Sequence, residues 1–198
     1  SGKYHNDEDD AYLTLHVPKG ARLVVDTVSA EITVTGVRGD QNLQSVSGEV
    51  GTQAFDAPVT ATAVSGEITI TGNGGKAVVT TENVSGSSTV SGIRGSYQGE
   101  VVSGEIQASI AQAERIEVST VSGEINVSAE LTPMARVEME SVSGTVALKI
   151  KPPVNADFEG GFQISKAFKK GECVFEYALC DHCRTGLMEE FSEESKAR

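Results

Sequence analysis

The sequence repeats one tripeptide, Val-Ser-Gly or a near copy of it, seven times at almost even spacing. The copies begin at Val28, Val46, Val64, Val84, Val102, Val121 and Val142, so that successive copies are 18–21 residues apart. Five of the seven copies continue into Glu and then Ile or Val. A fixed period in this range indicates a repeat array, in which each unit buries its apolar face against its neighbours.

Apolar residues occupy every second position on both sides of the tripeptide. Val59 and Ala61 precede Val64 in this way, and Ile68 and Ile70 follow it. A period of two predicts two short, half-buried strands in each repeat. The alternation slips by one residue just before the Val, so we expect a bend there. In that bend the Val points inward, the Ser bonds the turn and the Gly leaves room for the next coil.

One bend of each repeat has a fixed length, and the other absorbs all the insertions. This favours coils stacked in parallel over a hairpin meander, which needs equally strong turn signals at both ends of each strand. We therefore predict an all-β fold, a single-stranded parallel β-helix (solenoid) of about seven coils of 18–21 residues. The crossover rule for parallel strands favours right-handed winding.

The repeats divide the chain into three parts. Residues 1–10 carry an acidic run and are expected to be a disordered lead-in. Residues 11–157 form the β-helix repeat domain, because Pro152 and Pro153 stop strand stacking. Residues 158–198 are an irregular, Cys-containing tail, expected to be a short mixed or helical cap over the open end of the solenoid. Within the tail, residues 173–177 resemble a strand, and the apolar residues between 187 and 191 fit a short helix.

The net charge, the absence of long apolar runs and the positions of the Cys residues limit the classes of function that fit this sequence. The net charge of −12 argues against nucleic acid as a partner, because proteins that bind it carry basic faces. The sequence contains no run of eighteen apolar residues, so we expect no membrane span. All three Cys follow residue 172, so the repeats depend on neither disulfides nor metal.

Stacking turns equivalent positions into ladders, and two of these are charged. An acidic ladder follows the repeated Gly and contains Glu31, Glu49, Glu67, Glu105 and Glu124. A basic edge at the variable bend contains Arg38, Lys76, Arg94, Arg115 and Arg136. Both ladders suit a solvated surface whose charges keep sheet edges apart. Alternatively, the acidic ladder contacts a cation or a basic partner, such as the basic edge of a neighbouring rod, since like charges on opposed strand positions are destabilising.

The tail holds a second group of candidate metal ligands, which are Cys173, Cys180, His182 and Cys183. Two Cys that flank two residues make half of a zinc site, but no second such pair exists and His182 lies inside the first. A disulfide with one free thiol, inert thiols or a redox role are the alternatives.

Nothing in the repeats indicates catalysis or a cofactor. A Ser repeated in every coil is a turn-bonding ladder rather than a set of nucleophiles, and none of the three His lies in the repeats to act as a base. An enzyme that cleaves polysaccharides needs paired carboxylates in a groove, whereas these carboxylates form one ladder and aromatic residues are scarce.

The unit Val-Ser-Gly-Glu-Ile-Asn-Val at residues 121–127 resembles a bacterial, adhesin-like family of β-strand-repeat domains, and the resemblance extends over residues 11–157. It implies an exported β-helical protein of the periplasm, cell envelope or cell surface, and it supplies no catalytic residues. We therefore expect a structural or adhesive protein that binds a protein or cell-surface partner, with self-association as a further candidate. The alternatives are an envelope module that binds a ligand or senses stress and, less favoured, a polysaccharide-active enzyme.

Overall fold

A computed structural model describes residues 13–151 and the backbone of residues 174–177. Its elements are all strands: β1 (Leu23–Thr27), β2 (Ile32–Thr33), β3 (Gln41–Ser45), β4 (Val50–Ala54), β5 (Val59–Ala63), β6 (Ile68–Gly72), β7 (Lys76–Lys151) and β8 (Val174–Tyr177). In this part of the chain no helix has the length and hydropathy to cross a membrane. The lead-in over residues 1–10 and the short helix expected near the C-terminus lie outside the described residues.

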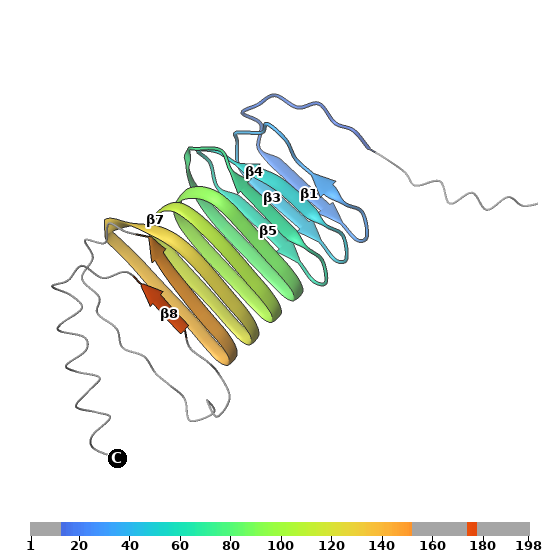
Figure 1. The fold of residues 1–198 in the computed structure, drawn as a ribbon. Coiled ribbons are helices and arrows are strands. Elements are labelled where there is room, and N and C mark those ends of the chain that lie inside the picture. Colours follow the sequence, from blue (N-terminus) through green and yellow to red (C-terminus); the bar gives the residue numbers. More distant parts are fainter. Residues whose placement is uncertain (1–12, 152–173, 178–198) are drawn as a thin grey trace, which may run out of the picture.

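All the strand pairs are parallel and follow the repeat period, which confirms the predicted solenoid. The first strands of successive coils pair in the order β1, β3, β5 and β7, and the second strands pair as β2, β4, β6 and β7. The register joins Leu23 to Gln41, Gln41 to Val59 and Val59 to Val79. These are the equivalent positions of the aligned repeats, so the sequence period predicts the register. Figure 1 shows the coils stacked side by side along the rod.

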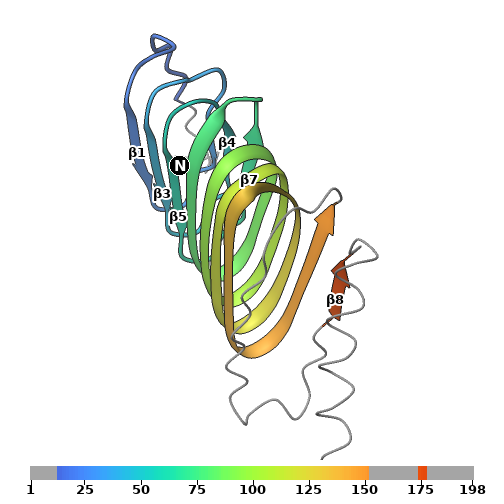
Figure 2. The ribbon, with the colours of Figure 1, turned by 90° about the vertical axis from the view of Figure 1, so that its left-hand side faces the viewer.

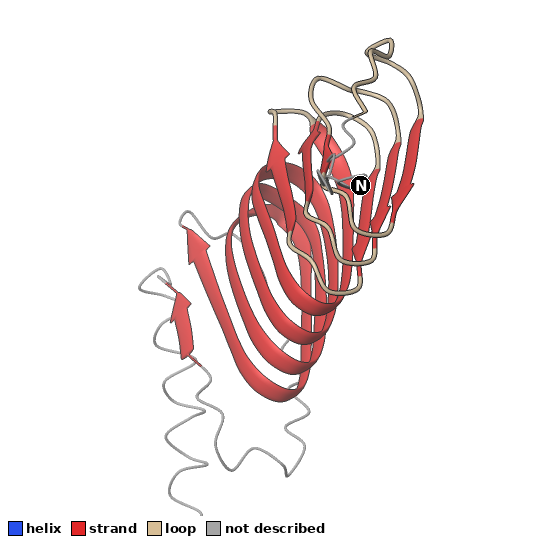
Figure 3. Ribbon diagram, turned by 90° about the vertical axis from the view of Figure 1, so that its right-hand side faces the viewer, coloured by secondary structure: helices blue, strands red, loops and turns tan. Residues whose placement is uncertain are grey.

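The length of the strands changes along the rod. In the early coils, loops join the separate strands, whereas the 76-residue β7 continues through its bends as one strand (Figure 3). Pairing between separate strands therefore resolves about four turns, fewer than the seven coils expected, because the later turns all lie within β7 (Figure 2). At the variable bends, Gly36, Gly74 and Gly92 have φ values of 71°, 86° and 68°, a backbone conformation that favours glycine.

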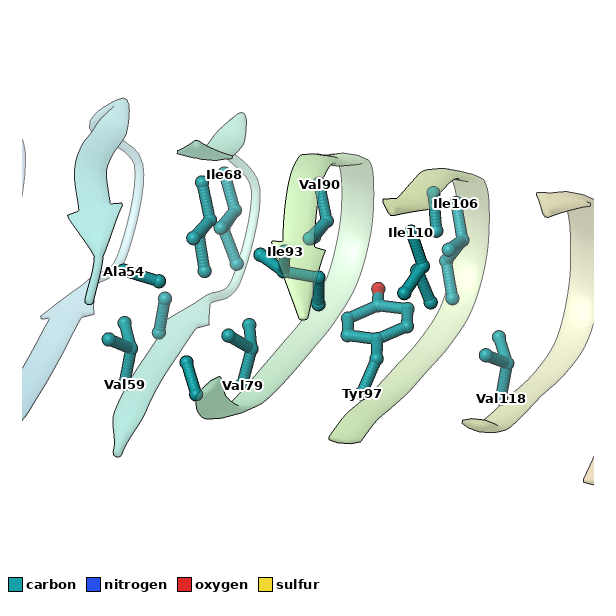
Figure 4. Packing of buried hydrophobic residues seen from close by; sticks show 14 of the residues in the cluster. Ala54, Val59, Ile68, Val79, Val90, Ile93, Tyr97, Ile106, Ile110 and Val118 are labelled. Atoms are coloured by element: carbon teal, nitrogen blue, oxygen red, sulfur yellow. The ribbon is translucent and has the colours of Figure 1, made fainter. Parts of the chain in front are cut away.

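Small and medium-sized apolar residues fill the narrow interior. In each coil they come from both strands, as Val59 and Ile68 do, and they stack on their equivalents in the next coil (Figure 4). Leu23, Val25, Val137 and Met139 in the first and last described coils are only partly buried, because among the described residues these segments pair with an adjacent coil on one side only.

Tyr97 is the largest fully buried side chain, and it points from its strand into the interior (Figure 4). Its hydroxyl group lies 2.9 Å from Thr81 Oγ1 in the adjacent coil, so the polar tip is hydrogen-bonded. Gly99 supplies the space for the ring, because a Cβ at Gly99 would lie 2.6 Å from the Tyr97 hydroxyl. Burial raises the pKa of Tyr97 to about 12, although the hydrogen bond to Thr81 opposes the shift.

The strand expected at residues 173–177 is confirmed as β8. It pairs in parallel with the end of β7, where Ala147 faces Val174 and Ile150 faces Tyr177. The tail thus returns to the rod and adds one strand to the last coil at the C-terminal end (Figure 2).

Candidate interaction surface

In five of the seven coils the fixed bend has a polar residue just before the repeated Val, and in the other two coils this residue is Ala63 or Val101. Ser45 is such a residue: it is 4% exposed, and its Oγ accepts a 2.8 Å hydrogen bond from the Gly48 N–H. Asn83 takes the same place one coil beyond Ala63, and its Nδ2 donates to Gly66 O at 2.8 Å. These side chains fix the bend from inside, because they bond backbone groups that would otherwise be buried without a partner.

The glycines of the bend form a continuous stack inside the corner. Each of them packs on the carbonyl oxygen of the equivalent residue one coil earlier, starting with Gly48 on Ala30 and ending with Gly144 on Gly123. A Cβ at Gly86 would also lie 3.0 Å from Asn83 Nδ2. Glycine is therefore required here by the close approach of two backbones.

The repeated valines point outward, so the inward orientation expected from the sequence is wrong. Because both the preceding residue and the Gly point inward, the Val and the Ser between them make the outside of the corner. The bend thus lies at Val-Ser and not before it. The exposed fractions of the seven valines are Val28 71%, Val46 45%, Val64 44%, Val84 47%, Val102 48%, Val121 50% and Val142 60%. We call this stack the valine ridge.

Two of the serines beside the valine ridge, Ser47 and Ser65, bond the previous coil through their hydroxyl groups, which refines the turn-bonding role expected for them. Ser47 donates to Val28 O through both its backbone N–H, at 2.9 Å, and its Oγ, at 3.1 Å. Ser65 repeats the pair of bonds to Val46 O at 2.9 Å and 3.4 Å. Their hydroxyl groups are thus engaged with backbone, as a structural ladder requires.

The five residues of the acidic ladder are exposed and lie on the outer side of the corner, one residue after the glycine stack. Short side-chain bonds hold three of them: Thr33 Oγ1 donates to Glu31 Oε1 at 2.9 Å, and similar bonds link Glu67 to Thr69 and Glu124 to Asn126. No ion pair within residues 13–151 involves this ladder. The described residues also contain no cluster of three or more His, Cys, Asp or Glu side chains that could hold a metal ion.

The basic edge is largely neutralised by neighbours in the same rod. Arg115 Nη2 lies 3.0 Å from Glu117 Oε2, Arg136 Nη2 lies 2.9 Å from Glu138 Oε2, and Lys76 pairs with Glu114. The Arg38 guanidinium stacks 5.2 Å from the ring centroid of Phe55. All five residues of the edge are exposed, but they do not make a continuous stripe of unpaired positive charge.

The structure also brings together carboxylates that the sequence analysis did not single out. A hollow of about 160 Å³ on the outer face of β7 is lined by Gln98, Gly99, Glu100, Glu117, Val118, Ser119, Glu138 and Glu140. Its four glutamates occupy outward positions two and four residues before the repeated Val. The alignment that revealed the ladder could have found them, had those two columns been compared as well.

The candidate metal ligands Cys173, Cys180, His182 and Cys183 lie outside the residues whose side chains the structure describes. The metal, disulfide and redox hypotheses for them therefore stay predictions.

Comparison with known proteins places this repeat architecture in one family. The family model described as Toastrack DUF4097 matches residues 3–162, a span that includes every repeat and all seven corners of the valine ridge. Neither a curated protein nor a solved structure matches the chain. The match supports a β-solenoid repeat domain of unknown function, which is the coarser part of the resemblance noted in the sequence. The chain belongs to the Toastrack DUF4097 family.

Proposed function

We propose that this chain is a non-enzymatic structural or adhesive element of the cell envelope, exported from the cytoplasm and acting through contacts with a protein or the cell surface. The observation that carries the proposal is the uniform outer corner. All seven coils present an exposed Val followed by Ser, and five of them add an exposed Glu. A surface that repeats with the coil spacing of ~4.8 Å suits an extended contact better than a single small ligand.

The acidic hollow supports a non-enzymatic role over polysaccharide cleavage. Two of its four glutamates, Glu117 and Glu138, are paired with arginines on the same face. Its lining contains no aromatic side chain on which a sugar ring could stack. Its volume of about 160 Å³ is also small beside the roughly 300–1,000 Å³ of typical small-molecule sites.

A second candidate is an envelope module that binds a ligand or senses stress, and the same hollow favours it. Glu100 and Glu140 are exposed there and take part in none of the ion pairs within residues 13–151. A small cationic ligand could contact both of them. This alternative requires a monomeric rod, because a lateral assembly would cover the face.

Export is tested in a bacterium that expresses the chain naturally, by adding protease to intact cells and then to spheroplasts. We expect cleavage before lysis, whereas a cytoplasmic control protein survives. Protection until the cells are lysed would contradict export.

Light scattering and electron microscopy of the purified chain, with and without calcium, test the structural or adhesive role. Filaments or lateral pairs support a structural element, and a strict monomer favours the sensing module. Turnover of any substrate on a glycan panel would overturn the non-enzymatic assignment.

A further inference from the structure

The valine ridge is a line of exposed apolar residues that recurs at the same position in every coil, unlike the other exposed apolar residues such as Val24 and Val78. Its seven side chains stay 44–71% exposed and stack at the coil spacing, so six steps of ~4.8 Å make a ridge about 29 Å long. Single exposed valines are ordinary, whereas an aligned apolar surface of this length marks a contact site.

Carboxylates border the ridge on both sides. On one side runs the acidic ladder, three residues after each Val. On the other side, two residues before the Val, lie Asp26, Glu82, Glu100 and Glu140. The uncharged members of these two columns are Gln44, Thr62, Ser119, Ser87 and Thr145. The ridge is therefore bordered by nine carboxylates and by no Lys or Arg from either column.

These charges determine which occupant fits. Two copies packed ridge to ridge would bring their carboxylates together, and each close pair would be repulsive. The basic edge of a second copy offers little compensation, because Lys76, Arg115 and Arg136 are already paired within their own rod. The complementary surface is an apolar line bordered by free Lys or Arg side chains.

The backbone along the ridge excludes binding by strand addition. Val46 N donates to Thr27 O at 3.3 Å and Val64 N donates to Ser45 O at 3.2 Å, so neighbouring coils already use these groups. A partner must therefore bind through side chains. Side chains along an α-helix repeat every ~5.4 Å, close to the ~4.8 Å of the ridge, and a helix of about 20 residues has the same length as the ridge.

From this geometry we propose that the valine ridge docks a cationic amphipathic α-helix of another polypeptide, which lies lengthwise with its apolar stripe on the valines and its Lys and Arg over the flanking carboxylates. The proposal deepens the contact role of the proposed function and rests on it for the assumption that the partner is a protein. It names the ridge as the surface and the cationic helix as the partner class.

The test uses the full chain and a labelled 20-residue model peptide with a Leu stripe flanked by Lys. Binding is measured by fluorescence anisotropy at low and at moderate salt. Two control peptides have the same length: one has the same composition in scrambled order, and the other carries Glu in place of Lys. We expect the Lys-flanked peptide to bind and to become helical by circular dichroism, and both controls to bind at least tenfold more weakly.

Three protein variants locate the contact. The triple variant Val64→Thr, Val84→Thr, Val102→Thr keeps β-branched side chains at the corner and should weaken binding at least tenfold. The variant Glu67→Gln, Glu105→Gln should weaken it several-fold at low salt and less at moderate salt. Val78→Thr is the matched control, since Val78 is 54% exposed but lies off the ridge, and it should bind as the parent chain does. Thermal unfolding confirms that each variant is folded.

Equal binding by the parent chain and the triple variant would overturn the proposal, as would equal binding of the Lys and Glu peptides. Binding of the chain to anionic vesicles in place of the peptide would also overturn it. These results leave the export assay untouched, so failure of the ridge proposal is distinguishable from failure of the proposed envelope role.

Discussion

The glycine stack gives the sharpest test of the packing argument, through Gly104→Ala. A Cβ at residue 104 would lie 3.0 Å from the carbonyl carbon of Gly86 and 3.1 Å from its nitrogen, with the carbonyl oxygen closer still. Carbon atoms in contact normally lie about 3.5–4.0 Å apart, so the two coils must separate by at least roughly 0.5–1 Å at this corner. The clashing atoms are backbone atoms, which cannot rotate away as the end of a side chain can.

Separation of the coils strains the bonds that join them at the corner. Such a bond is seen at the equivalent corner one coil earlier, where the Ser85 N–H donates to Val64 O at 2.8 Å. Overpacking costs about 1–3 kcal/mol and each weakened backbone hydrogen bond about 1 kcal/mol, so we expect Gly104→Ala to lower the free energy of unfolding by about 2–4 kcal/mol.

Urea unfolding followed by circular dichroism at 218 nm measures this loss as a lower midpoint at an unchanged slope. Gly51→Ala in β4 is the control. A Cβ at Gly51 would lie 3.9 Å from Ile32 O, an ordinary contact, so the free energy should stay unchanged or rise by up to about 0.5 kcal/mol. Equal losses for the two substitutions would refute the stacking argument, because they would show that any side chain at a glycine in these coils is harmful.

Three further outcomes follow from the same geometry. Ser45→Ala leaves the buried Gly48 N–H without its acceptor and should lower the free energy of unfolding in urea by about 1–3 kcal/mol. Ser47→Ala should lower it by under about 0.5 kcal/mol, because the backbone N–H of residue 47 still bonds the previous coil. Equal losses for the two variants would contradict the inward corner bond. Burial keeps Tyr97 neutral with a pKa of about 12 against 10.0 unfolded, so its contribution of about 2–3 kcal/mol is complete below pH 10 and is lost as pH rises toward 12. In unfolding measured from pH 9 to 12, Tyr97→Phe should therefore lose most of this alkaline slope, and an unchanged slope would place its origin elsewhere. Because the carboxylates of the acidic ladder repel one another, raising the salt concentration from about 0.01 to 1 M should raise the melting temperature, and a fall would show that attractive pairs dominate the surface.

Much of the fold could be predicted from the sequence, because the repeat supplies two independent signals. The period of two within each strand separates inward from outward residues, and the period of 18–21 residues sets which positions pair between coils. The observed pairing of Gln41 with Val59 and of Val59 with Val79 is the alignment of the repeats. Even the isolated strand β8 was predictable, since residues 174–177 combine β-branched and aromatic residues.

The orientation of the corner residues was predicted wrongly because the apolar side chains of the repeated Val residues at the corner do not point inward. The residues that point inward just before the Val include Ser45, Asn83 and Thr120, which are polar, while the apolar Val beside them points outward. A pattern based on burial of apolar residues therefore shifts the bend by one position. The backbone of the bend decides the orientation, because the inward position accepts apolar Ala63 and Val101 as well as polar Ser45 and Asn83. The period of apolar residues therefore does not reveal it.

The ion pairs were less accessible to sequence reasoning for another reason. The outward columns vary from coil to coil, and insertions at the variable bend change which residues face each other. Lys76 pairs with Glu114, which is 38 residues and two coils away. Such pairs depend on side-chain reach across coils, so they follow from three-dimensional placement and not from the period.

The seven coils also provide an internal comparison that bears on the valine ridge. The outward position four residues before the Val varies freely among Val, Asn, Thr, Gln and Glu, whereas the ridge position is Val in every coil. Core packing does not require this uniformity, because the ridge is exposed. A preference of the bend for β-branched residues would be met equally by Thr or Ile. If Val→Thr on the ridge changes the free energy of unfolding by less than about 0.5 kcal/mol per site, the bend itself does not require Val, which supports the proposed contact role of the ridge.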